Sequence, residues 1–326
     1  MKNSKLNTII RYVLVFLLLT IQCPESIAQN DIRNIDNIFC IGNGNMAAYG
    51  AGADIIQVFG PPYSAPSLLD LKLTDSTIQV VSTREMGTAI WTHELKRGNV
   101  LVGKIVDLMD TLSPIFIRRF EMNEPVIFNV HANGRTKLLN NTSSYLNFKV
   151  TGAMLTESPR GTPFYNDYPM PFKQFMQVIT KGNAMMDTVP VNGNFRLHVS
   201  AGNSFAYIVG GPLYPDCISF THAVLSASYE SVESRVRIFW KRFTERRKDF
   251  EKSFSPGVPD RKKLLWAIDA VAVNCKTQQS IAGGVLAGHN YHLGYVRDQY
   301  GVSRGLLKMG YYTEARGILD FFWQRW

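Results

Sequence analysis

The sequence has little cysteine, and no two of its cysteines form a C-x-x-C pair. The four are Cys23, Cys40, Cys217 and Cys275. Their number and spacing argue against a disulfide framework and against a zinc ribbon. A single bridge such as Cys40–Cys217 and buried free thiols both stay open, and we interpret the last three cysteines as core residues. Lipidation of Cys23 is disfavoured because Gln22 is a poor neighbour for such a site.

Long apolar runs are absent beyond the N-terminus. There, three cationic residues precede an apolar run over 12–21, and a short segment with small residues follows at 26–28. This pattern predicts a signal peptide over residues 1–28 and export to the periplasm, the cell surface or the extracellular space. The run is about half of the ~20 residues that a membrane-spanning helix needs, and no later segment is long enough, so we expect no integral membrane span.

Charged residues are few, at 19%, and the net charge of +9 is not spread along the chain. Residues 29–240 hold 17 basic and 17 acidic residues, whereas residues 241–263 hold nine basic and four acidic ones. A basic cluster of this kind is typical of a solvated helix face and a linker. We therefore expect no nucleic-acid partner, and no pattern indicates an oligomeric state.

Several motifs of cofactor and nucleophile chemistry are missing, among them G-x-S-x-G, a Walker loop and H-E-x-x-H. Residues 42–47 read G-x-G-x-x-A, but strand formers follow at 51–58 where a dinucleotide site needs a helix N-terminus. We interpret these glycines as turn or bulge residues and expect no cofactor. His289 and His292 lie three apart without a third ligand, which favours a loop or substrate-facing role over a metal site.

What the sequence does have is a long stretch of alternating apolar residues. Over residues 31–218 the apolar spacing is mostly two, and turn-forming clusters interrupt it repeatedly. The clearest alternating triplets are Val126, Phe128 and Val130; Leu146, Phe148 and Val150; and Phe195, Leu197 and Val199. Many short strands in succession predict a large antiparallel β-sandwich, which we place at residues 29–225.

From about Ser228 the apolar spacing changes to that of helices. The first helical pattern has Val232, Val236, Phe239, Trp240 and Phe243 on one face. The second has Leu264, Ala267, Ile268, Val271, Ala272 and Cys275, and the last has Ala315, Ile318, Leu319, Phe322, Trp323 and Trp326. A third helix is predicted from about Arg297 to a stop at Gly310. We place a helical linker at 226–258 and the first helices of a further domain at 259–326.

The final helical pattern has no stop signal and would leave its apolar face uncovered. We therefore expect that the chain continues beyond Trp326. The four helices look like the opening of a longer antiparallel helical array.

The segment 281–298 is the most unusual part of the chain, because four glycines, several rings and an Arg-Asp pair come together before a helix. Rings stack on sugars, while guanidinium and carboxylate groups hydrogen-bond hydroxyls strongly, so the mixture suits a polyol site. The alternative is that Asp298 is a helix-capping acid with Arg297 as its ion-pair partner. Spacing alone supports both interpretations equally.

Residues 290–298, N-Y-x-x-x-Y-x-R-D, together with Met309-Gly310-Tyr311-Tyr312-Thr313-Glu314-Ala315, resemble the first helical hairpin of six-hairpin glycosidases. Glucoamylase-like enzymes of glycoside hydrolase family 15 are the most similar. The resemblance implies a multidomain protein, β then α, with a β-sandwich, a helical linker and the first helices of an incomplete (α/α)6 toroid. It also implies a carbohydrate substrate.

Carried over residue by residue, the resemblance implies that Arg297 and Asp298 bind hydroxyls of the non-reducing-end sugar in the −1 subsite. Tyr295 stands where the family usually has Trp, which keeps a stacking ring but changes the pocket wall. Tyr291 matches an aromatic residue that touches the sugar. We expect His292 to complete this substrate-binding set.

The family's reaction needs a general acid and a general base, and it inverts the anomeric centre. In the family both are glutamates of later helix connections, so we name no catalytic residue here and expect the 326-residue chain itself to be inactive. Glu314 is interpreted as a first-turn helix acid. The expected function is the N-terminal part of a secreted, exo-acting, inverting α-glucosidic glycosidase. The alternatives are a glycoside phosphorylase and a non-catalytic carbohydrate-binding β-sandwich protein.

Overall fold

One large antiparallel sheet forms most of the molecule. The computed structural model describes residues 38–326 except 66, 133–135, 142–143, 151–153, 156–169, 172–173, 188–192, 212–221, 223–225, 256, 289–293 and 325–326. The predicted signal peptide, Cys217, Tyr291 and His292 lie outside the described residues. The strands are β1 (Ile38–Gly42), β2 (Ala47–Ala51), β3 (Asp54–Phe59), β4 (Ser64–Ala65), β5 (Leu69–Leu73), β6 (Gln79–Arg84), β7 (Trp91–Arg97), β8 (Val100–Met109), β9 (Ile115–Met122), β10 (Val126–Ala132), β11 (Thr136–Asn141), β12 (Tyr145–Val150), β13 (Met154–Leu155), β14 (Met170–Pro171), β15 (Gln174–Met186) and β16 (Asn194–Gly211).

The strand order shows how the sheet holds together. Thirteen of these strands form one sheet whose main path is β1-β2-β3-β5-β10-β16-β9-β8-β7-β6, and β4, β13 and β14 form a small second sheet. The 18-residue strand β16 lies at the centre. Its first part pairs with β10, its later part pairs with β9, and β15 pairs with both parts.

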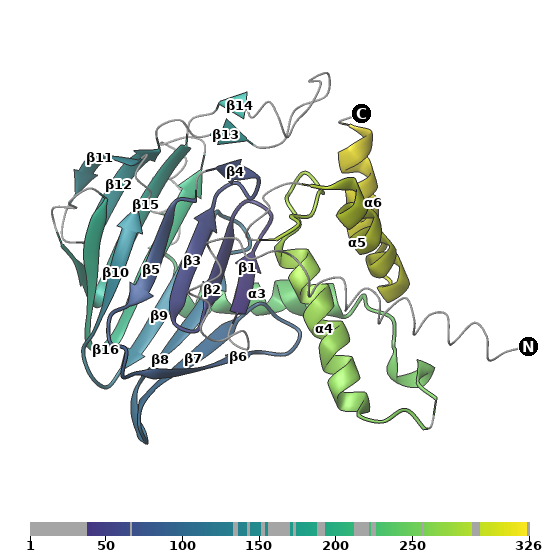
Figure 1. Cartoon of the computed structure of the whole chain (residues 1–326), viewed down its shortest axis with the longest axis horizontal. Helices are drawn as coiled ribbons and strands as arrows, with labels where there is room; N and C mark the ends of the chain where they lie inside the picture. Colours follow the sequence, from purple (N-terminus) through teal and green to yellow (C-terminus); the bar gives the residue numbers. More distant parts are fainter. Residues whose placement is uncertain are drawn as a thin grey trace, which may run out of the picture. The chain divides into compact units, whose positions relative to one another are not determined.

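The predicted β-sandwich is wrong, because thirteen of the strands belong to one curled sheet and the second sheet has only three two-residue strands (Figure 1). The pairing of β15 with β16 shifts register between Gly182 and Ala184, and Gly182 has a φ of +79°. Irregularities of this kind bend a strand and increase its twist, so one sheet can wrap around its own core. Alternating burial is the same in a sandwich and in a curled sheet, which is why the sequence pattern did not separate them.

The alternation itself is confirmed within the core. The predicted triplets in β10, β12 and β16 are all buried in one cluster with residues of β5, β8 and β9. Arg118 is also buried there, and its guanidinium donates to Asp107 through Nε (2.8 Å) and Nη2 (2.6 Å). Burial alone would raise the pKa of Asp107, but Arg118 outweighs it and the pKa lies below its ordinary value.

The helices follow the sheet along the chain. They are α3 (Tyr229–Thr244), the 3-10 turn η3 (Glu251–Ser253), α4 (Arg261–Thr277), α5 (Val296–Met309) and α6 (Tyr312–Trp323). The predicted face of α3 is confirmed, since Val232, Val236, Trp240 and Phe243 are buried in a cluster that includes Ile117 and other residues of the sheet. Gly310 ends α5 as predicted, with a φ of +94°.

The predicted opening of an (α/α)6 toroid is wrong for the part of the chain that the structure describes. That part has four α-helices, of which α5 and α6 form an antiparallel pair while α3 shares a core with the sheet (Figure 1). Helical periodicity specifies an apolar face but not the element that the face contacts. None of the described helices is both long and apolar enough to cross a membrane.

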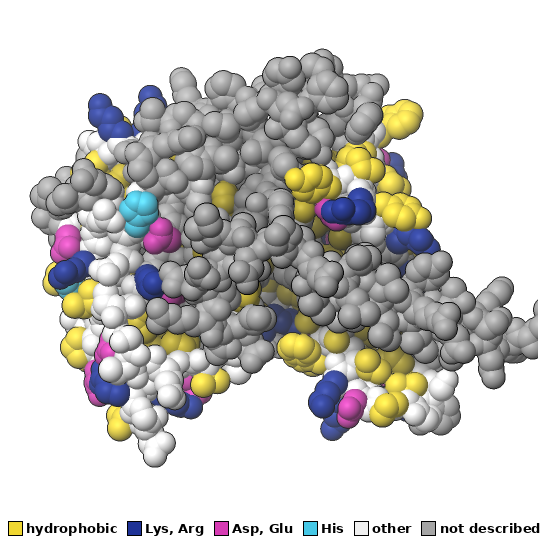
Figure 2. Space-filling model, viewed as in Figure 1, with side chains coloured by type: hydrophobic (Ala, Val, Ile, Leu, Met, Phe, Trp, Pro, Cys, Tyr) yellow, Lys and Arg dark blue, Asp and Glu magenta, His cyan; other side chains and the backbone are white. Residues whose placement is uncertain are grey.

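Helix α4 also departs from its predicted face. Leu264 and Val271 are exposed, whereas Asp269 is buried. Figure 2 shows hydrophobic side chains on the surface of the helical part, where several large ones of α4, α5 and α6 are exposed.

Candidate functional site

The predicted sugar-binding pair lies at the start of α5. Tyr295 is the residue before the first turn, and Arg297 and Asp298 follow within that turn. Arg297 Nε lies 3.2 Å from Asp298 Oδ1, and the Arg297 side chain is 86% exposed. The N-cap residue of α5 is Tyr295, and the Asp298 side chain makes no capping hydrogen bond within the described residues. The structure thus brings Arg297 and Asp298 together at the surface, which suits both sugar binding and a favourable charge at the helix start.

The loop that precedes α5 is fixed from two directions. The buried side chain of Gln299 accepts from the backbone N–H of Val285 (2.8 Å) and donates to the carbonyl of the same residue. Gly283 has a φ of +104°, and a Cβ there would lie 2.1 Å from the carbonyl oxygen of Gly317 in α6. These contacts hold Gly283 close to α6 and Val285 close to the first turn of α5.

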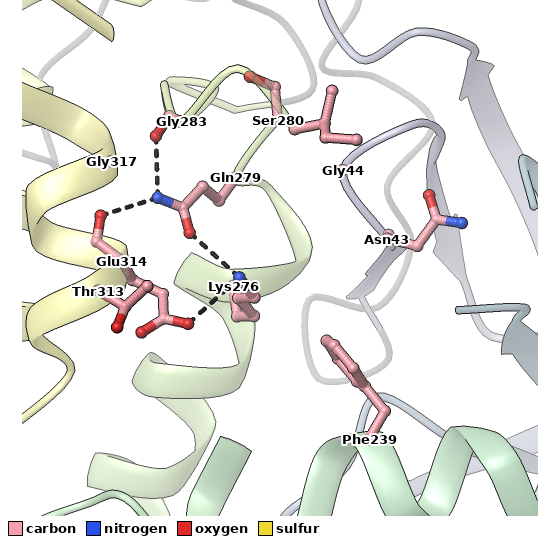
Figure 3. Close-up of a pocket in the computed structure, with 12 residues that line it drawn as sticks. Asn43, Gly44, Phe239, Lys276, Gln279, Ser280, Gly283, Thr313, Glu314 and Gly317 are labelled. Carbon is pink, nitrogen blue, oxygen red and sulfur yellow. Dashed lines mark hydrogen bonds and ion pairs between the residues drawn. The ribbon is translucent and has the colours of Figure 1, made fainter. Parts of the chain in front are cut away.

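An ionic cluster around the buried carboxylate of Glu314 connects α4, α6 and the segment after α3. Figure 3 shows its contacts among Lys276, Gln279, Gly283 and Glu314. Glu314 Oε1 accepts from Arg246 Nη2 at 2.7 Å and lies 3.4 Å from Lys276 Nζ. Gln279 Nε2 donates to the backbone oxygens of Glu314 and Gly283, both at 2.9 Å. We call these five residues the Glu314 cluster.

Opposing effects set the protonation of the Glu314 cluster. Burial alone would raise the pKa of Glu314, but the Arg246 hydrogen bond and the charge of Lys276 outweigh it, so the pKa lies below its ordinary value. Burial lowers the pKa of Lys276, and Glu314 only partly offsets this. Glu314 is therefore a carboxylate at neutral pH, which fits a structural tie better than a proton donor.

The Glu314 cluster borders a pocket of about 300 Å³ beside the β1–β2 turn (Figure 3). Asn43 closes that turn, since its Oδ1 accepts from the backbone N–H groups of Asn45 and Met46. Its Nδ2 donates to the carbonyls of Asp110 and Ser113. Gly44 is thus a turn residue, as the sequence indicates, whereas Gly42 ends β1. The amide of Asn43 is committed to the fold, and in Figure 3 it points away from Lys276.

Sequence reasoning predicted the position of Glu314 in the first turn of α6 but missed its partners. Arg246, Lys276 and Gln279 belong to other segments, and their types are ordinary for exposed positions. The only signal was the basic cluster at 241–263, which we interpreted as solvated. Arg246 comes from that cluster and contacts a buried carboxylate instead.

Neither a metal site nor a reactive thiol is present among the described residues. No three His, Cys, Asp or Glu side chains among the described residues gather as a metal site would require. Cys40 and Cys275 are free. Burial raises the pKa of Cys40 to about 12 and that of Cys275 to about 11, so neither is a reactive thiolate at neutral pH.

Comparison with known proteins defines the class of fold. No family model matches the chain, and no curated protein sequence matches it. Among solved structures, a bacterial glucoamylase in complex with acarbose is similar over 87% of this chain and 49% of that protein, with a TM-score of 0.61 and 9% sequence identity. A glycoside hydrolase of family 81 from Clostridium thermocellum is similar over 56% of this chain and 24% of that chain, with a TM-score of 0.33 and 10% identity.

The chain therefore has a glycosidase-like fold. Its particular likeness is to the glucoamylase, and it spans about half of that enzyme's length. At 9% identity this is a likeness of fold alone.

Proposed function

We propose that the protein is an exported glycosidase that cleaves α-glucosidic bonds at the non-reducing end of oligo- or polysaccharides, with inversion. The observation that carries the proposal is the agreement of two independent features. The fold is similar to a glucoamylase over 87% of the chain. The loop and helix start at 294–298 carry the residue types that resemble that family's sugar-binding segment.

In this proposal Arg297 and Asp298 bind hydroxyls of the terminal sugar, and Tyr295 offers a ring against one face of it. A guanidinium donates and a carboxylate accepts, so together they satisfy both parts of a vicinal diol. Their mutual ion pair is exposed and therefore weak, so a sugar can replace it at little cost. Tyr291 and His292 extend the same binding set.

Inverting hydrolysis needs a general acid to protonate the leaving oxygen and a general base to activate water on the opposite side. We assign neither role to a residue of this chain. Glu314 is a poor choice for the acid because Arg246 and Lys276 keep it ionised.

The proposal is tested by assaying the whole protein on maltotetraose and following the product's anomeric protons by NMR. We expect β-glucose as the first product. Arg297→Ala should lower kcat/KM at least ~100-fold with the fold intact. Arg316→Ala is the matched control, because Arg316 is also an exposed arginine paired with a neighbouring carboxylate, Asp320, and should leave turnover unchanged.

Each other outcome of this assay has a distinct meaning. Glucose 1-phosphate formed only with added phosphate would identify a phosphorylase. Turnover that Arg297→Ala leaves untouched would contradict the assignment of Arg297. Maltotetraose binding without turnover under either condition would identify a non-catalytic carbohydrate-binding protein.

A further inference from the structure

A second and larger pocket lies between the β1–β2 hairpin and α4. Its volume is about 520 Å³, and neither Arg297 nor the Glu314 cluster lines it. Pockets that bind small molecules usually measure about 300–1,000 Å³. The space is therefore large enough for a ligand of one or two sugar rings.

Aromatic side chains from three strands and α4 line this pocket, namely Phe39, Tyr49, Trp91 and Trp266. Trp266 on α4 is 53% exposed, although indole rings usually bury most of their surface. The guanidinium carbon of Arg84 lies 5.9 Å from the centre of the Trp266 ring, and Arg84 is itself held by Asp269 Oδ2 at 2.7 Å. Trp266 is thus a supported ring with free surface, which is what stacking on the apolar face of a sugar requires.

The polar groups that line the pocket include the amides of Asn274 and Gln278 at the end of α4 and the indole of Trp91. The hydroxyl of Tyr49 donates to Gln278 Oε1 (3.4 Å). The buried indole N–H of Trp91 has no acceptor within the described residues, and Asn274 is exposed. Hydroxyl groups are both donors and acceptors, so a polyol would satisfy both kinds of group.

The charged side chains around the pocket indicate which class of ligand it can bind. Among the described residues that line the pocket, Arg84 is the one ionic side chain, and its guanidinium is already bound to Asp269 and to the backbone oxygen of Thr88. The described wall of the pocket thus offers no carboxylate to a cationic ligand, and its guanidinium is committed to protein oxygens. The combination of rings, amides and a committed guanidinium suits an uncharged oligosaccharide.

Two residues of the segment between α4 and α5, Ala287 and Gly288, also line the pocket. Neither belongs to the proposed terminal-sugar contacts, so among the described residues the pocket and the Arg297–Asp298 pair have no lining residue in common.

We propose that the pocket lined by Trp266, Trp91, Asn274 and Gln278 is an accessory carbohydrate-binding site that takes neutral oligosaccharides apart from the Arg297–Asp298 pair. This inference rests on the proposed function, because the accessory site would be a second place where the proposed glycosidase binds its class of substrate. Stacking on Trp266 supplies affinity, and the amide of Asn274 fixes the orientation of the sugar.

The test uses the protein labelled with 5-fluorotryptophan, in which each of the five tryptophans gives a fluorine NMR signal. Maltotetraose should shift the Trp266 and Trp91 signals while leaving the Trp323 signal in place. Trp323 on α6 is the internal control because it is 77% exposed and lies outside the pocket. Tetragalacturonate, a charged oligosaccharide, should shift none of the three.

Variants separate this inference from the proposed function. Trp266→Ala should weaken maltotetraose binding at the Trp91 signal at least tenfold, and Trp323→Ala should not change it. Both side chains are exposed, so both variants are expected to fold. In Arg297→Ala the Trp266 shift should persist, since the two sites are separate.

The outcomes distinguish the two failures. A Trp266 signal that does not respond to maltotetraose, or that responds equally to tetragalacturonate, would overturn the accessory site whatever Arg297 does. A normal Trp266 response together with full turnover in Arg297→Ala would leave the accessory site standing and contradict the assignment of Arg297.

Discussion

Glu314 links three segments of the helical part of the chain. It is 5% exposed, and its carboxylate contacts two cations from segments far away in the sequence. Removing this carboxylate would leave Lys276, which is 25% exposed, without its counter-charge, while Arg246, at 42% exposed, keeps access to water.

We therefore expect Glu314→Gln to lower the free energy of unfolding by about 1–2 kcal/mol, because Lys276 loses its counter-charge in a partly buried site whereas the exposed Arg246 regains water. Urea denaturation at pH 7 measures this. The matched control is Glu245→Gln, a more exposed acid 3.9 Å from Lys241, which should change stability little. Equal effects of the two substitutions would contradict the importance of the cluster.

The same residue predicts a pH dependence. The pKa of Glu314 is lowered in the folded protein from its ordinary value of 4.5, so its contribution is fully present above that value. The contribution is lost as the pH falls through the folded pKa. The stability gap between the unmodified protein and Glu314→Gln should accordingly shrink below about pH 4.5. A gap that stays constant down to pH 2.5 would show that charge is not the cause.

At the scale of residues, the sequence predicted neighbours in the chain better than distant partners. The adjacency of Arg297 and Asp298 at a helix start is evident from their positions. The pairing of Arg246 with Glu314 is not, since 68 positions separate them and neither belongs to a recognisable motif. Such contacts depend on how whole elements meet.

At the scale of elements, the apolar periodicity predicted that a helix exists and where it ends more reliably than it predicted which face of the helix is buried. Helix α3 buries its predicted face against the sheet. Helix α4 buries Ala272 of its predicted face but also Asp269, whose oxygens accept from Arg84 Nη2 (2.7 Å) and Arg247 Nη1 (3.1 Å). An ionic contact can thus bring a charged residue into a buried position that apolar periodicity does not indicate.

The loop before α5 gives a prediction for an element. Gly283→Ala should lower the free energy of unfolding by about 2 kcal/mol, because the added Cβ would meet the Gly317 carbonyl at 2.1 Å and the φ of +104° disfavours any side chain. Gly305→Ala in α5 is the control of opposite sign. The Cβ added at position 305 would have no heavy atom within 4 Å, so this substitution should stabilise the helix by about 0.5–1 kcal/mol. Thermal unfolding of both variants measures these changes. If both substitutions changed the stability in the same direction, the close approach of Gly283 to the Gly317 carbonyl would be contradicted.

At the scale of the whole molecule, the curl of the sheet decides the architecture. The alternating pattern predicted the strands, but β9 and β10 pair with different parts of β16, and that register is a long-range property. Local patterns do not contain this information. The sequence resemblance to glucoamylase-like enzymes is confined to residues 290–298 and 309–315, whereas the likeness over 87% of the chain is a property of the assembled fold, at 9% identity.

The most direct test of sugar recognition at the start of α5 is calorimetric titration of the 326-residue chain with acarbose. We expect binding that Arg297→Ala weakens at least tenfold, and that the matched variant Arg316→Ala changes less than twofold. Acarbose binding that is equally strong in Arg297→Ala would contradict the account, because the proposed terminal-sugar contact would then contribute nothing.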